Sequence, residues 1–116
     1  MTLVVDASVT VPACLVPDGF ASIPDTKLIA PPLMWSEARS ALHELAWRGV
    51  LDADTASSAR ERLDSCPVKR IDDEHVGAAA WRIADELGWA KTYDAEYVAL
   101  AQIYGCRVVT VDVRLR

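Results

Sequence analysis

A chain of 116 residues has room for one domain with a substantial hydrophobic core and is too short for two. Hydrophobic residues make up 52% and charged residues 25%, which excludes a disordered chain, and no apolar run is long enough to span a membrane. The formal net charge of −5 argues against a protein that coats nucleic acid through its basic residues, although it leaves room for a nuclease. The three cysteines are widely spaced and no signal peptide opens the chain, so we expect a reducing, cytoplasmic location.

The first half of the chain is predicted to alternate strands with helices. Residues 2–5 form a β-branched and aliphatic run typical of a buried parallel strand. Residues 8–15 have weak helical character, in which Pro12 is tolerated only in the first turn. A short strand over residues 28–30 precedes the clearest helix, residues 33–48, whose apolar side chains recur at helical spacing.

The second half continues this alternation. The expected elements are, in order, a helix to Leu63 capped by Asp52 or Asp54, a strand over 68–71, a helix from its cap Asp72 to Leu87, a helix over 95–104 that is buried nearly all round, and a strand over 107–111. Strands that alternate with helices in this way predict a parallel sheet with helices on both faces. The predicted fold class is therefore α/β, a three-layer α/β/α sandwich with a short central parallel sheet.

Four acidic residues are predicted to meet at one edge of this sheet. Asp6 follows the first strand and Asp112 the last, and the carboxyl ends of parallel strands share an edge. Asp94 is suited to cap its helix and Glu37 lies one turn into another, so both reach that edge if the helices run antiparallel to the strands. Clustered carboxylates repel one another, and a divalent cation such as Mg²⁺ or Mn²⁺ is the usual remedy. The pattern therefore indicates a metal-dependent hydrolase.

Each of these residues also has an ordinary explanation. Asp6 fits an N-cap or an Asx turn, Asp94 fits an N-cap, and Glu37 fits a solvated helix position. Ser8 and Thr110 each lie two residues from a strand-end aspartate, where a hydroxyl group could orient a carboxylate or a metal-bound water. A helix cap for Ser8 and ordinary strand packing for Thr110 are the alternatives.

Four segments of the chain resemble the PIN domain. They are V-V-D-A-S at residues 4–8, W-S-E at 35–37, T-Y-D-A-E-Y-V-A-L-A at 92–101 and V-V-T-V-D-V-R-L at 108–115. The likeness covers essentially the whole chain in the right order and is most specific in residues 92–101 and 110–112. Within this family, the sequence most resembles the ribonuclease toxins of prokaryotic VapBC toxin–antitoxin pairs.

The resemblance implies that residues 1–116 form a single PIN-like domain that hydrolyses RNA phosphodiester bonds with Mg²⁺ or Mn²⁺. By position, Asp6 and Asp94 are implied as the principal metal ligands, with Glu37 and Asp112 completing the acidic site directly or through water. The resemblance also implies a cognate antitoxin protein as partner, a homodimer, and no association with a membrane. Whether one metal ion or two takes part is left open.

Two features of the chain leave further alternatives. Proteins of this family usually continue beyond the position of Arg116, so we expect the sheet to lack the usual C-terminal edge strand or to gain it from a partner. A catalytically inactive PIN-like module that only binds a protein or RNA is therefore the alternative function. Trp47 falls opposite the apolar stripe of its helix, so it is either an interface residue or a residue covered by the next helix.

Overall fold

The computed structural model describes residues 1–23 and 26–111, and it contains every strand and helix expected from the sequence. Along the chain these are β1 (Thr2–Val5), α1 (Ala7–Cys14), the 3₁₀ helix η1 (Gly19–Ser22), β2 (Lys27–Ala30), α2 (Leu33–Trp47), α3 (Ala53–Asp64), β3 (Val68–Arg70), α4 (Val76–Leu87), α5 (Tyr93–Tyr104) and β4 (Arg107–Val109). None of the helices in this part of the chain combines the length and apolarity needed to cross a membrane.

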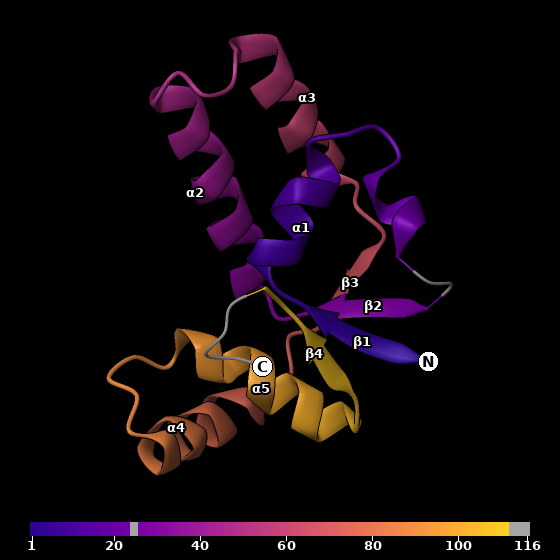
Figure 1. The fold of residues 1–116 in the computed structure, drawn as a ribbon. Coiled ribbons are helices and arrows are strands. Elements are labelled where there is room, and N and C mark those ends of the chain that lie inside the picture. Colours follow the sequence, from indigo (N-terminus) through magenta and orange to yellow (C-terminus); the bar gives the residue numbers. More distant parts are fainter. Residues whose placement is uncertain (24–25, 112–116) are drawn as a thin grey trace.

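The strands of the described residues form one parallel sheet in the order β3–β2–β1–β4. Val4 in β1 lies opposite Ile29 in β2 and Val108 in β4, so β1 is an interior strand. Helices α1, α2 and α3 lie on one side of the sheet, and α4 and α5 lie on the other (Figure 1). This arrangement confirms the predicted α/β fold class with three layers.

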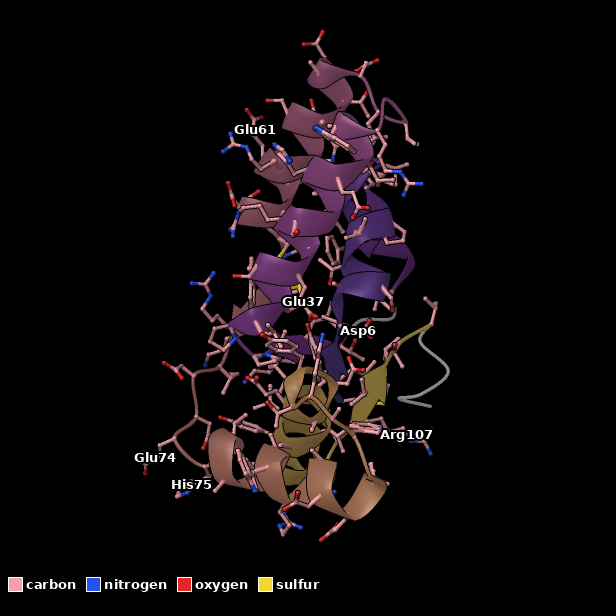
Figure 2. All side chains as sticks on the ribbon, turned by 90° about the vertical axis from the view of Figure 1, so that its left-hand side faces the viewer. Asp6, Glu37, Glu61, Glu74, His75 and Arg107 are labelled. Carbon is pink, nitrogen blue, oxygen red and sulfur yellow. The ribbon has the colours of Figure 1, made fainter. Side chains whose placement is uncertain are left out.

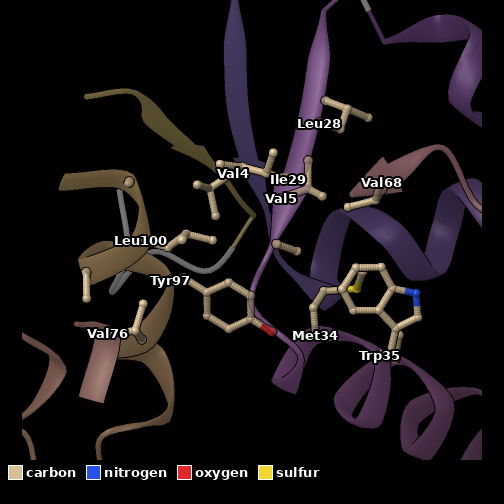
Figure 3. Close-up of a cluster of buried hydrophobic side chains, with 14 of the residues drawn as sticks. Val4, Val5, Leu28, Ile29, Met34, Trp35, Val68, Val76, Tyr97 and Leu100 are labelled. Atoms are coloured by element: carbon tan, nitrogen blue, oxygen red, sulfur yellow. The ribbon is translucent and has the colours of Figure 1, made fainter. Parts of the chain in front are cut away.

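The hydrophobic core lies where the interior strands meet α2 and α5. Val4, Val5 and Ile29 are completely buried, which explains why β1 and β2 have continuous apolar sequences. Met34 of α2 and Tyr97 of α5 belong to the same cluster (Figure 3). Full burial of a Val or Ile side chain contributes about 1.5–3 kcal/mol, so this cluster fixes the strands that lead into the site.

The connection from α4 to α5 starts at a glycine. Gly88 ends α4 with a φ of 70°, a left-handed conformation that glycine adopts without strain. The Trp89 N–H then donates to the Ala84 carbonyl at 2.9 Å. The connection therefore leaves α4 in a fixed direction.

Helix α4 begins later than predicted. The prediction that Asp72 caps it is wrong, because the helix starts at Val76. The Asp73 carboxylate accepts the His75 N–H at 2.8 Å, and the Asp73 carbonyl accepts the Val76 N–H at 3.1 Å. These bonds form a turn that competes with the first turn of a helix, so the helix starts only after it.

Helix α5 begins earlier than predicted. It starts at Tyr93 with Thr92 at its N-cap, so the prediction that Asp94 caps this helix is wrong and Asp94 lies in its first turn. Residues 102–104 are exposed, so α5 is not buried all round at its C-terminal end.

Helix α1 and the outer strands also depart from expectation. Pro12 lies beyond the first turn of α1, against the prediction, but its side chain is exposed and the helix ends two residues later at Cys14. Strand β3 ends at Arg70, one residue early. Strand β4 ends at Val109, because the next residues turn away from the ladder and form hydrogen bonds to side chains near β1.

Candidate active site

The candidate site lies at the carboxyl edge of the sheet, between β1 and β4. The chain runs from β1 outward to β2 and β3, and then returns to place β4 on the other side of β1. In open α/β sheets, ligands bind in the crevice at such a reversal of strand order. Asp6 directly follows β1 and Thr110 directly follows β4, so these two residues flank the crevice.

Asp6 is 5% exposed and is held by groups from both sides of this crevice. Its Oδ1 accepts hydrogen bonds from Ser8 Oγ at 2.6 Å and from the Val9 N–H at 3.3 Å, so Asp6 is the N-cap of α1. The Thr110 hydroxyl donates to Oδ2. Ser8 Oγ also accepts the Val111 N–H at 3.0 Å. Asp6 is therefore both a helix cap and a carboxylate fixed at the crevice, and the two interpretations of the sequence are compatible.

Glu37 lies near the start of α2 and is half-buried, so it is not the solvated helix residue of the alternative interpretation. Its Oε1 accepts a hydrogen bond from the Tyr97 hydroxyl. Burial raises the pKa of the Glu37 carboxyl, and the negative charges of Asp94 and Asp6 raise it further, whereas the hydrogen bond from Tyr97 lowers it. The pKa of Glu37 thus reflects both aspartates, as expected if the three carboxylates share one site.

Asp94 is partly buried and lines a cavity of about 530 Å³ together with Glu37 and residues of the α4–α5 connection. Figure 2 shows Asp6 and Glu37 near each other, where the start of α2 faces α5. The structure therefore brings together Asp6, Glu37 and Asp94, with Ser8 and Thr110 beside Asp6. Asp112, the remaining predicted site residue, lies outside the described residues.

Sequence reasoning missed one residue of this site. Tyr97 is 1% exposed, and burial together with the hydrogen bond to Glu37 strongly raises the pKa of its hydroxyl, which keeps it a proton donor. Tyr97 lies three residues after Asp94, which places both on one helix face, and this spacing is the feature of the sequence that could have identified it. Burial and the charge of Glu37 also raise the pKa of Glu96, but Glu96 lines a different cavity, together with Asp72 and Val76.

The donor set suits a hard divalent cation. The candidate ligands supply carboxylate oxygens, which Mg²⁺ and Mn²⁺ prefer. Within residues 1–23 and 26–111, no three acidic, histidine or cysteine side chains are grouped so that they could hold a metal ion by themselves. Mg²⁺ commonly uses one or two carboxylates and completes its coordination with water and substrate phosphate. The residues present fit that mode of binding.

The fold and the site together define a class, namely small α/β domains with carboxylates at the strand-order reversal of a parallel sheet. The sequence matches the PIN domain family over residues 3–116. The chain therefore belongs to the PIN-domain family.

Two relatives in sequence are ribonucleases by name. They are the VapC ribonuclease Mb0985 of Mycobacterium bovis and ribonuclease VapC9 of Mycobacterium tuberculosis, each 37% identical over 115 residues, which cover 97% of this chain and 87% of the relative.

Two solved structures have a similar fold. The crystal structure of PAE2754 from Pyrobaculum aerophilum matches with a TM-score of 0.79 and 29% identity, over 99% of this chain and 77% of that protein. The crystal structure of VapC20 from Mycobacterium tuberculosis, a toxin that cleaves the sarcin–ricin loop, matches with a TM-score of 0.66 over 97% of this chain and 92% of that protein. Its identity is 18%, so this second likeness shows the fold alone.

Proposed function

We propose that this chain is a metal-dependent endoribonuclease, using Mg²⁺ or Mn²⁺, and that it acts in the cytoplasm as the toxin of a toxin–antitoxin pair. The observation that carries the proposal is the placement of acidic residues at this edge of the sheet: Glu37 and Asp94 line one cavity, and Asp6 follows β1 at the crevice between β1 and β4. The ribonuclease names of relatives that are 37% identical to the chain support it.

In the proposed site, Asp6 and Asp94 hold the metal ion, and Glu37 and Asp112 complete the acidic set. When bound, the ion supplies positive charge at the phosphate and makes a water molecule more acidic. Asp6 enters this role with its orientation already set, because both of its carboxylate oxygens accept hydroxyl hydrogen bonds. A ligand that is fixed in advance loses little conformational freedom when the site is filled.

Glu37 is the residue best suited to handle a proton. Hydrolysis requires a water molecule to lose a proton as its oxygen attacks phosphorus, and a carboxylate with a raised pKa accepts that proton more readily near neutral pH. Because Tyr97 engages Oε1, the other oxygen, Oε2, is left to orient the water.

A cleavage assay on pooled RNA tests the proposed function. We expect the wild type to cleave RNA with Mg²⁺ or Mn²⁺ and not in EDTA, and we expect Asp94→Asn to lose on the order of 100-fold in rate. Asp85→Asn is the control, because Asp85 is an exposed carboxylate of α4 outside the site. Cleavage that persists in Asp94→Asn, or that is absent at every metal concentration, would favour the inactive binding module instead.

We also propose a cognate antitoxin protein and a second copy of the chain as partners. Trp47 at the end of α2 is 81% exposed and Trp81 on α4 is 69% exposed, and aromatic side chains of this size are enriched at protein interfaces. Helix α3 does not cover Trp47, so the interface interpretation of this residue is favoured. Light scattering over a range of concentrations tests the homodimer, and a monomer at every concentration would contradict it.

A further inference from the structure

The connection between α4 and α5, residues 88–92, forms one wall of the cavity that Glu37 and Asp94 line. The direction of this wall is set where it leaves α4, because Gly88 adopts the left-handed conformation and the Trp89 N–H donates back into the helix at 2.9 Å. The cavity, at about 530 Å³, falls within the range of about 300–1,000 Å³ that is usual for sites of small ligands. A formed cavity of useful size therefore adjoins the acidic residues.

Lys91 supplies positive charge to this wall. Among the described residues that line the cavity, Lys91 is the only one with a positive charge. Its side chain is exposed, and it forms no ion pair with any described residue. The carboxylates of Glu37 and Asp94 line the same cavity, in a chain with a net charge of −5. These charges repel an approaching phosphodiester, and an ammonium group beside them offsets part of that repulsion. Lys91 is thus placed to receive a phosphate at the site.

Tyr93 supplies an aromatic surface to the same cavity. It is the first residue of α5 and is 54% exposed, whereas Tyr97, one helical turn later, is 1% exposed. The core therefore uses one tyrosine of this segment and leaves the other at the cavity. Exposed aromatic rings beside a positive charge are the usual means by which proteins bind unpaired nucleotides, because any base can stack on them.

We propose that this cavity binds one unpaired nucleotide of the RNA, next to the bond that is cleaved. The Lys91 ammonium contacts its phosphate, and the Tyr93 ring stacks against its base. This inference rests on the proposed function, since it takes RNA as the substrate. It requires the RNA to be single-stranded at this position, because a base within a duplex cannot present its face to Tyr93.

Fluorescence anisotropy with a fluorescein-labelled pool of random eight-nucleotide RNAs, in EDTA and at low salt, tests the inference. We expect Lys91→Gln to weaken binding about tenfold and to reduce the slope of log affinity against log salt by about one. We expect Tyr93→Leu to weaken binding about tenfold with no change in that slope, and Tyr93→Phe to restore it because the ring is kept. Lys69→Gln and Tyr104→Leu are matched controls, since both side chains are exposed outside the cavity.

Unchanged affinity in Lys91→Gln or in Tyr93→Leu overturns the inference. No binding by the wild type, or equal affinity for an RNA duplex of the same length, also overturns it. The metal-dependent cleavage assay is scored separately. Cleavage by the wild type combined with unaffected binding in both variants means that the nuclease assignment stands and the nucleotide site is wrong. Binding that depends on Lys91 and Tyr93, without any cleavage by the wild type, means that the nucleotide site stands and the nuclease assignment is wrong.

Discussion

The Tyr97 hydroxyl donates a hydrogen bond to Oε1 of Glu37 and so ties the buried face of α5 to the acidic residue of α2. A hydrogen bond to a carboxylate favours its ionised form. It therefore opposes burial and the charges of Asp94 and Asp6, all of which raise the pKa of Glu37. A residue outside the predicted acidic set thus controls both the orientation and the charge of one member of that set.

Tyr97→Phe removes this hydrogen bond and keeps the buried ring. We expect the pKa of Glu37 to rise further, because the interaction that lowers it is lost, so the acidic limb of RNA cleavage moves to higher pH. We also expect the free energy of unfolding to fall by about 1–2 kcal/mol. A pH–rate profile and a denaturation curve measure the two effects. Tyr104→Phe, at an exposed tyrosine, serves as the control, and an unshifted acidic limb in Tyr97→Phe contradicts the assignment.

The raised pKa of Glu37 predicts how stability depends on pH. The folded state holds this proton more tightly than the unfolded state, so stability falls as pH rises from the usual glutamate value of 4.5 through the folded-state pKa. We expect the free energy of unfolding of Glu37→Gln to exceed that of the wild type by an amount that grows as the pH rises through this range. Below pH 4.5 we expect the two proteins to differ less. Chemical denaturation at pH 4 and pH 7 measures this. Glu61→Gln, at an exposed glutamate of α3, should show no such trend, and a pH-independent effect of Glu37→Gln argues against the prediction.

Divalent ions should stabilise the folded protein, because the proposed ligands are brought together only by folding. At an ion concentration 100 times the dissociation constant, the gain is about 2.7 kcal/mol. We expect the thermal midpoint to rise with added Mn²⁺ in the wild type and in Asp85→Asn, and to rise much less in Asp6→Asn. Differential scanning calorimetry gives this result without RNA. Equal shifts in all three proteins would exclude Asp6 as a ligand.

Gly19 is required where η1 approaches α1. A Cβ atom at this position would lie 1.9 Å from the Ala13 carbonyl oxygen, so Gly19→Ala forces the backbones apart. We expect it to lower the free energy of unfolding by about 1–3 kcal/mol. Gly77→Ala in α4 is the contrasting control, because a Cβ there meets no atom within 4 Å. We expect that change to stabilise the protein by about 0.5–1 kcal/mol in a urea titration, and the opposite order would refute the packing argument.

Arg62 connects α3 to the end of α1. Its Nε donates a hydrogen bond to the Cys14 carbonyl at 2.6 Å, and that carbonyl lies at the last residue of α1. We expect Arg62→Met to lower the free energy of unfolding by about 1.5–3 kcal/mol, because the bond involves a charged donor. Arg60→Met, two residues earlier and exposed, should change it little. Similar losses in the two variants would show that the hydrogen bond is unimportant.

The parts of the fold that depend on local patterns were predictable. The buried strand β1 could be identified from its run of β-branched and aliphatic residues, and the end of α4 from Gly88. The position of Asp6 at the sheet edge followed from parallel topology, which needs only the order of elements. The start of α4 could not be predicted in this way, because the side chain of Asp73 stabilises a competing turn.

The contacts within the site were harder to predict, because they join residues far apart in the sequence. Tyr97 and Glu37 are separated by 60 positions, and an apolar helix face gives no indication that one buried hydroxyl reaches a carboxylate. The exposure of Trp47 could not be predicted either, since helical periodicity shows which face of a helix turns away from the core but not whether another element covers that face. Both depend on the packing of α2 against other elements.

The hydrogen bonds that fix Asp6 also have a consequence for the order in which this edge of the sheet is assembled during synthesis. Thr110, which donates to the second oxygen of Asp6, is synthesised 104 positions after it. A chain still being translated has no β4 and cannot hold this carboxylate in place from both sides. The second oxygen of Asp6 is therefore held only after β4 has been synthesised and has paired with β1.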